Sequence, residues 1–136
     1  MRVLIDSSAW VEFLNGTASP QRRAVAELVA GEDEICTCGV IVAEVFQGLR
    51  RHQGRDRLQR LFQDLLFLEP SGIGSYFRAA EVYRLLRGKG VTVRSTIDCL
   101  IAVVAEENGC YILTRDKDLD LILQSGAVDS RSWPSK

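Results

Sequence analysis

The sequence lacks most of the features that would place a protein in a specialised class. Its 136 residues include one histidine and four cysteines without a CxxC pair, which is a poor ligand supply for a zinc site. The N-terminal apolar run covers only residues 3–5, too short for a signal peptide or a membrane span. Repeats and low-complexity segments are absent as well. We therefore expect a single domain over residues 1–136 that stays in the cytoplasm without membrane attachment.

The composition is that of an ordinary globular protein, with 46% hydrophobic and 26% charged residues. The 17 basic and 18 acidic side chains leave a formal net charge of −1, which permits an anionic partner without requiring one. A chain of this length can bury about two thirds of its unfolded surface, so it can form a real core. In a reducing cytoplasm the cysteines are expected to be buried thiols of that core: Cys36, Cys38, Cys99 and Cys110.

Strand-like and helix-like segments alternate along the chain. Short apolar runs predict strands at 2–5, 34–38 and 110–114, with a shorter strand at 67–70 and an edge strand at 127–133. Apolar residues at helical spacing predict a helix ending at Leu14, helices at 21–30, 39–52, 55–67, 74–86 and 95–109, and a short one within 115–126. This alternation predicts an α/β fold around a mostly parallel sheet, with helices on both faces.

Four acids stand at strand ends or inside apolar helices. Asp6 follows the first predicted strand and Asp116 follows the strand CYILT, so both are expected at the edge where parallel sheets bind ligands. Glu44 and Asp98 are embedded in VIVAEVF and TIDCLIAVVA, where an ionised acid needs a partner or a metal. Carboxylates without matching histidines or cysteines favour Mg²⁺ or Mn²⁺. One or two such ions would activate water against a phosphodiester, the natural substrate of such a site.

Each acid also has an ordinary structural interpretation. Asp6 could cap the first helix, and Glu44 could point to solvent or pair with an arginine. Asp98 stands in the first turn of its helix, where the helix dipole favours negative charge, and Asp116 could belong to a solvated charged turn. Their joint placement, each at a strand end or on an apolar helix, favours one shared site over four separate roles.

With these acids the chain resembles the PIN-domain ribonucleases, most closely the small single-domain toxins of the VapBC toxin–antitoxin type. The matching segments are VLIDSSAWVEF, ICTCGVIVAEVFQGL, STIDCLIAVVAEENG and YILTRDKDLDLI, whereas residues 53–93 carry little of the likeness. The resemblance implies a three-layer α/β/α sandwich and an endoribonuclease that depends on Mg²⁺ or Mn²⁺. It also implies an RNA substrate, a homodimer, and a cognate antitoxin whose C-terminal segment lies across the active site.

Carried over residue by residue, the resemblance implies a catalytic, metal-binding cluster of Asp6, Glu44, Asp98 and Asp116. Ser8 and Thr114 match positions whose hydroxyls support that cluster, and Asp118 matches a further acid that is a candidate ligand. Leu119 stands where a phenylalanine is common, a departure that should affect packing more than chemistry.

Basic side chains crowd the end of one predicted helix and the start of the next: Arg50, Arg51, Arg55, Arg57 and Arg60. They form either a solvated helical face or a rim that binds RNA phosphates, with Arg50, Arg51 and Arg55 as the candidates. The main rival function is a non-catalytic RNA- or antitoxin-binding module of the same fold. A receiver domain needs two adjacent acids after the first strand, and a haloacid-dehalogenase-like phosphatase needs a second aspartate where Ser8 stands.

Overall fold

The computed structural model describes residues 1–49 and 54–134, which form an α/β structure around one parallel sheet. The strands of the sheet are β1 (Arg2–Ile5), β2 (Glu34–Cys38), β3 (Leu66–Leu68) and β4 (Tyr111–Leu113). Their spatial order is β3-β2-β1-β4, so β1 lies inside the sheet between β2 and β4.

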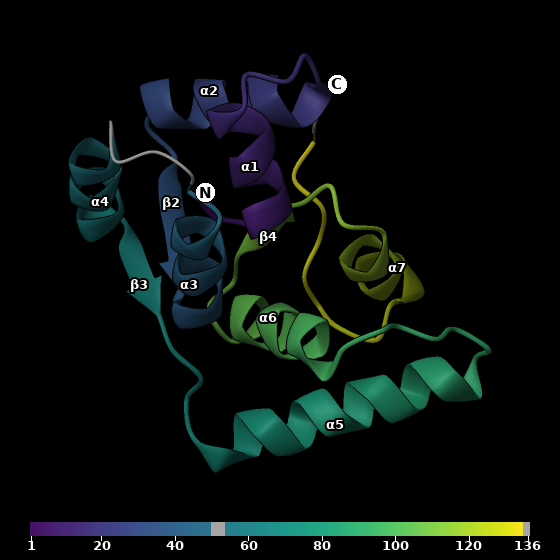
Figure 1. Ribbon diagram of the computed structural model, residues 1–136. Helices are drawn as coiled ribbons and strands as arrows, with labels where there is room; N and C mark the ends of the chain where they lie inside the picture. Colours follow the sequence, from purple (N-terminus) through teal and green to yellow (C-terminus); the bar gives the residue numbers. More distant parts are fainter. Residues whose placement is uncertain (50–53, 135–136) are drawn as a thin grey trace.

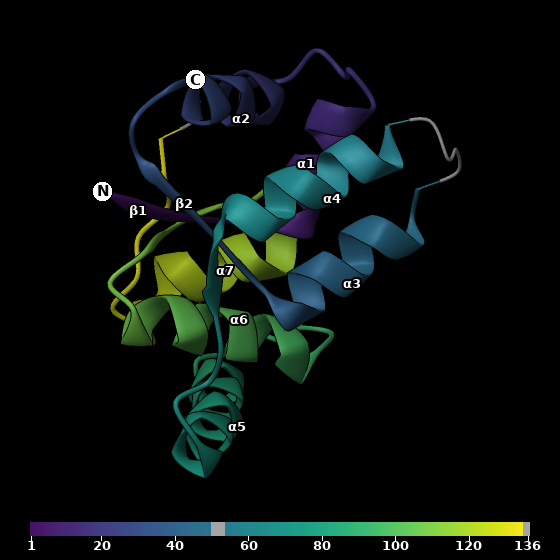
Figure 2. The same cartoon turned by 90° about the vertical axis from the view of Figure 1, so that its left-hand side faces the viewer.

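Helices cover both faces of this sheet. In the part of the chain that the structure describes they are α1 (Ser7–Leu14), α2 (Pro20–Ala30), α3 (Gly39–Gln47), α4 (Arg55–Asp64), α5 (Ile73–Gly88), α6 (Thr96–Glu107) and α7 (Lys117–Ser125). Figure 2 shows α1, α2 and α4 above the sheet and α5, α6 and α7 below it. α5 is the outermost helix of the lower layer and packs against α6 (Figure 1). The predicted three-layer α/β/α sandwich is confirmed.

The core follows from the position of β1. Val3, Leu4 and Ile5 are all fully buried, because helices cover both faces of this inner strand. Trp10, on α1, is also fully buried and stacks at a tilt on Phe62 of α4, with ring centroids 4.8 Å apart. All four cysteines are free and buried, as predicted. None of the described helices combines the length and apolar character needed to cross a membrane.

Several predicted elements differ from the structure in their bounds, including the strand expected over 67–70, which is Leu66–Leu68. The helix expected over 55–67 ends at Asp64, because Leu66 and Phe67 pair with β2 as part of β3. The helix expected over 39–52 is shorter: α3 ends at Gln47, and residues 50–53 lie outside the described part of the chain. The edge strand expected over 127–133 is reduced to a single bridge between Ile112 and Ser132.

The carboxyl ends of β1 and β4 meet at one edge of the sheet. Ile5 is in register with Leu113, and the backbone N–H of Asp6 donates to the Leu113 carbonyl at 2.9 Å. The chain proceeds from β1 to β2 and β3 on one side, whereas β4 lies on the other side. This reversal of strand order is the switch point at which open α/β sheets bind ligands.

Candidate active site

Asp6 is a buried acid held by two hydroxyl groups. Its side chain is 4% exposed, and its Oδ2 accepts hydrogen bonds from Ser8 Oγ at 2.8 Å and Thr114 Oγ1 at 3.0 Å. Although Asp6 immediately precedes α1, its carboxylate makes no capping hydrogen bond to that helix. Burial raises the pKa of the Asp6 carboxyl above its ordinary value, and the two hydroxyls partly offset the rise. Helix capping therefore does not explain this acid.

Asp116 begins α7 and combines two roles. Its Oδ1 caps the helix by accepting hydrogen bonds from the backbone N–H groups of Asp118 at 2.7 Å and Leu119 at 3.3 Å. Its own backbone N–H donates to Thr114 Oγ1 at 2.9 Å, so the same threonine contacts both Asp6 and Asp116. Both capping bonds use Oδ1, whereas Oδ2 accepts no hydrogen bond from a described residue.

Asp98 and Glu44 approach the site from α6 and α3. The pKa of Asp98 rises from 3.8 to about 7, mainly through burial and further through the charges of Asp116 and Asp6. Burial and the neighbouring charge of Asp6 also raise the pKa of Glu44, whose Oε1 accepts a hydrogen bond from Ser7 Oγ at 3.2 Å. The charge of Asp116 raises the pKa values of Asp6, Glu44 and Asp98, and the charge of Asp6 raises those of Glu44 and Asp98. The four acids therefore act on one another electrostatically.

The tightest group of carboxylates differs from the predicted set of four. Oxygens of Asp98, Asp116 and Asp118 lie within 4.8 Å of one another. Asp118 is also bound to Arg94, which holds its pKa below the ordinary value through the backbone N–H and then the side chain. A donor set of carboxylate oxygens alone, with raised pKa values at Asp6, Glu44 and Asp98, fits a hard divalent cation such as Mg²⁺ or Mn²⁺.

Ser8 links this site to the loop after β4. Its Oγ accepts a hydrogen bond from the backbone N–H of Arg115 at 2.9 Å and lies 3.2 Å from Thr114 Oγ1. The Arg115 guanidinium in turn forms an ion pair with Glu12, one helical turn after Ser8. α1 is therefore connected to the loop that carries Asp116 at two points.

The RNA-binding role of the arginine cluster stays a prediction. Arg50 and Arg51 lie outside the described residues, and Arg55, the first residue of α4, is exposed without a hydrogen bond or ion pair to the site. Among the described residues, the cation that pairs with an acid of this region is Arg94, bound to Asp118. Sequence reasoning missed this arginine. Its only sequence signal was its place four residues before Asp98.

Comparisons with known proteins agree with this fold. The PIN domain family model matches residues 3–122. VapC ribonuclease Mb1587 of Mycobacterium bovis and ribonuclease VapC11 of Mycobacterium tuberculosis are each 38% identical over 132 residues, covering 96% of this chain and 98% of theirs.

Among solved structures, VapBC2 from Rickettsia felis, bound to a promoter DNA fragment, aligns with a TM-score of 0.70. The two chains are 17% identical, and the alignment covers 98% of this chain and 100% of the VapBC2 chain. FitAcB from Neisseria gonorrhoeae aligns with a TM-score of 0.63 at 19% identity, over 97% and 96% of the two chains. These solved structures therefore share the fold of this chain. The chain belongs to the PIN domain family and, within it, to the VapC ribonucleases.

Proposed function

We propose that this protein is a metal-dependent endoribonuclease that acts as the toxin of a type II toxin–antitoxin pair. One observation carries the proposal: the negative charges of Asp6, Glu44 and Asp116 raise the pKa of the half-buried Asp98, in a chain 38% identical to named ribonucleases. We propose that this protein acts on RNA in the cytoplasm.

The residues proposed to hold a divalent ion are Asp6, Glu44, Asp98 and Asp116. Mg²⁺ or Mn²⁺ bound there supplies Lewis-acid polarisation of a phosphodiester and lowers the pKa of water. Ser8 and Thr114 orient Asp6 by donating to the same oxygen, which leaves Oδ1 directed to other partners. Thr114 also holds the backbone at Asp116. These hydroxyls therefore preorganise two carboxylates on different segments without adding charge.

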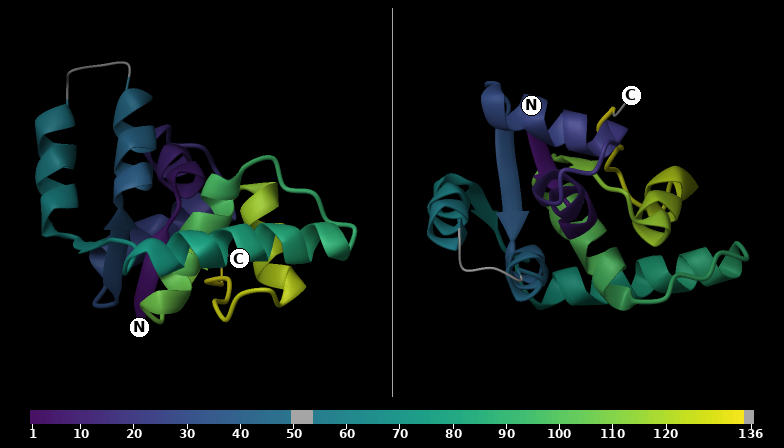
Figure 3. Two further views of the ribbon diagram at one scale, coloured as in Figure 1. Left: turned by 90° about the horizontal axis from the view of Figure 1, so that it is seen from below. Right: turned by 45° about the horizontal axis from the view of Figure 1, so that its top comes forward.

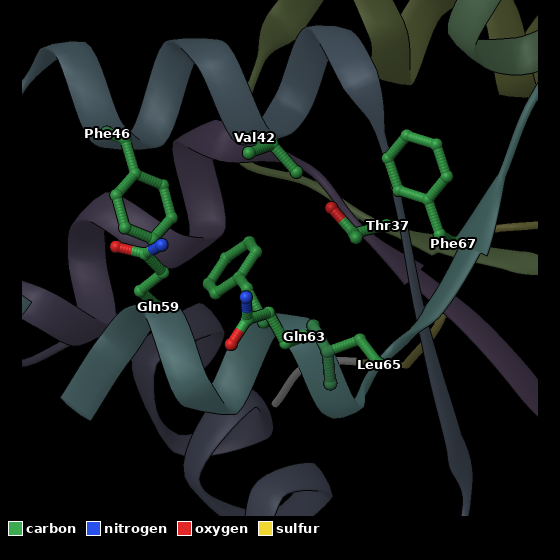
Figure 4. Close-up of a pocket in the computed structure, with 8 residues that line it drawn as sticks. Thr37, Val42, Phe46, Gln59, Gln63, Leu65 and Phe67 are labelled. Atoms are coloured by element: carbon green, nitrogen blue, oxygen red, sulfur yellow. The ribbon is translucent and has the colours of Figure 1, made fainter. Parts of the chain in front are cut away.

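An antitoxin partner is supported by an apolar groove between α3 and α4, with a volume of about 500 Å³ (Figure 4). α3 and α4 lie side by side in both views of Figure 3. Val42 and Phe46 line one wall and Phe62 the other, and Phe67 at its end is 52% exposed. The buried Thr37 hydroxyl at this groove has no hydrogen-bond partner among the described residues. A peptide segment with apolar side chains and one polar group would match this lining.

A homodimer is supported by a second apolar surface at the start of α5. Ile73, Tyr76 and Phe77 are 73%, 54% and 67% exposed, respectively. Three large apolar side chains within five residues are an exposed cluster of the kind that marks a protein interface. We therefore propose separate surfaces for the second copy and for the antitoxin.

The test compares the purified wild type with the Asp98→Asn variant on total cellular RNA, in Mg²⁺, in Mn²⁺ and in chelator. Discrete fragments that require both the metal and Asp98 are the expected result. Intact RNA in every sample, from folded protein free of antitoxin, would instead favour the non-catalytic binding module. A cellular test is independent of the substrate: expression without an antitoxin should arrest growth, and normal growth would contradict the toxin role.

A further inference from the structure

Arg94 is held beside the carboxylate cluster by a single oxygen. Its Nε donates to Asp118 Oδ2 at 3.0 Å, and its backbone N–H donates to the same atom at 2.9 Å. Asp118 is 8% exposed and contributes to the group of oxygens that includes Asp98 and Asp116. Both the main chain and the side chain of Arg94 are therefore held at the edge of the site.

The other end of the guanidinium is open. The Arg94 side chain is 81% exposed, and its two terminal nitrogens form no hydrogen bond or ion pair with a described residue. The preceding Val93 is 2% exposed and packs in the core, so the backbone carrying Arg94 is anchored as well. A guanidinium that is held along one edge and free along the other loses little conformational entropy when it binds an oxyanion.

Electrostatics indicates what this open end binds. The acids of the cluster repel a polyanion wherever their charge is not neutralised. Among the described residues, Arg94 is the only cationic side chain that forms an ion pair with Asp118 or with any of the four proposed metal-binding acids, and its partner is Asp118. A guanidinium binds phosphate oxygens through paired N–H donors, whereas the surrounding carboxylates cannot donate.

We propose that Arg94 binds a phosphate of the RNA strand beside the cleaved bond, and that Asp118 is the anchor of this arginine. The assignment rests on the proposed ribonuclease function and adds to it the residue that receives the strand. It also gives Asp118 a role distinct from that of the metal ligands, although its carboxylate lies within 4.8 Å of those of Asp98 and Asp116.

RNA binding tests the assignment in an Asp98→Asn background, in which the RNA stays uncut. The probe is a fluorescein-labelled single-stranded RNA of mixed sequence, titrated in Mg²⁺ at several salt concentrations and followed by anisotropy. Adding Arg94→Ala should weaken binding by about tenfold. It should also reduce the slope of log Kd against log salt by about 0.7, the value for one phosphate contact on a single strand. The RNA affinity of the Arg94→Lys protein should lie between those of the Asp98→Asn parent and the Arg94→Ala protein, because lysine keeps the charge but lacks the paired donors.

Arg2→Ala is the matched control. Arg2 forms the same type of ion pair, Nε to Glu34 Oε1 at 2.8 Å, but at the opposite, N-terminal end of β1. The Arg2→Ala substitution should leave both the RNA affinity and the slope of log Kd against log salt unchanged. Equal RNA binding by the Arg94→Ala and Arg2→Ala proteins would overturn the role of Arg94. No RNA binding by the Asp98→Asn parent would overturn that role together with the proposed function.

Metal binding tests the role of Asp118 separately, by calorimetric titration of Mn²⁺ into the full chain without RNA. Asp118→Asn keeps an oxygen that accepts both Arg94 hydrogen bonds, so it should lose much less Mn²⁺ affinity than Asp98→Asn. Arg94→Ala should retain or increase that affinity, because it removes a positive charge next to the site. If Asp118→Asn and Asp98→Asn lose Mn²⁺ affinity equally, Asp118 is a metal ligand and its assignment as an anchor is wrong.

Discussion

Replacing Asp98 by asparagine should stabilise the metal-free protein at alkaline pH. In the folded chain the Asp98 pKa rises from 3.8 to about 7, chiefly because the carboxyl is buried and then because other acids surround it. The folded protein thus binds more protons than the unfolded chain between these two pH values. The free energy of unfolding must therefore fall as the pH rises through this window, and the loss is complete above about pH 7.

The size of this effect follows from the shift. Each pKa unit corresponds to about 1.4 kcal/mol, so the whole rise represents about 4 kcal/mol in the ionised state. Solvent screening of the half-buried side chain reduces the expected effect on stability to about 2 kcal/mol. Asparagine has nearly the same shape without the charge. Asp98→Asn should therefore match the wild type near pH 4 and exceed its stability at pH 8.

Urea unfolding in chelator, at a series of pH values, measures this difference directly. Asp64→Asn is the control, because Asp64 is exposed at the end of α4 and forms no ion pair with a described residue. Adding Mn²⁺ at 100 times its Kd should then stabilise the wild type by about 2.7 kcal/mol and the Asp98→Asn protein much less. Identical pH profiles for the wild type and Asp98→Asn would show that Asp98 carries no strained charge, and would refute the reasoning.

Three further outcomes are expected. Asp6→Asn should abolish metal-dependent RNA cleavage in a gel assay without unfolding the protein, and residual cleavage comparable to that of the wild type would remove Asp6 from the proposed ligand set. Ser8→Ala should lower both cleavage and stability, the latter by about 1 kcal/mol in urea titration, because Asp6 and the Arg115 N–H each lose a hydrogen bond; an unchanged cleavage rate would argue against a positioning role. Phe77→Ser should shift the protein to monomer in light scattering while preserving its circular dichroism, and a persistent dimer would place the interface elsewhere.

Local sequence patterns predicted the elements well where one physical cause was sufficient. The strand at 2–5 was read correctly because an unbroken apolar run requires burial on both faces. The end of α4 was misplaced because Leu65 and Leu66 continue the helical spacing of apolar residues beyond Asp64. Pairing with β2 decides that boundary, and pairing partners are not encoded in local periodicity.

The candidate site shows the same division. The four acids were identifiable because an ionisable residue next to apolar neighbours is costly without a partner, and that conflict is visible in one segment at a time. Their relation to Arg94 was not visible, since Asp118 and Arg94 are 24 residues apart and meet only when α7 packs beside α6. The role of Asp116 as a helix cap, which uses only Oδ1, likewise depends on where α7 begins.

The sequence by itself thus determined the α/β class, the buried strands and the acids that need a counter-charge, because hydrophobic burial and the cost of isolated charge act on each segment separately. The tertiary structure alone decided which acids act on one another, which hydroxyls donate to Asp6 and which arginine pairs with Asp118. Those relations depend on contacts between residues far apart in the chain, and parallel pairing of β1 with β4 is what brings them together.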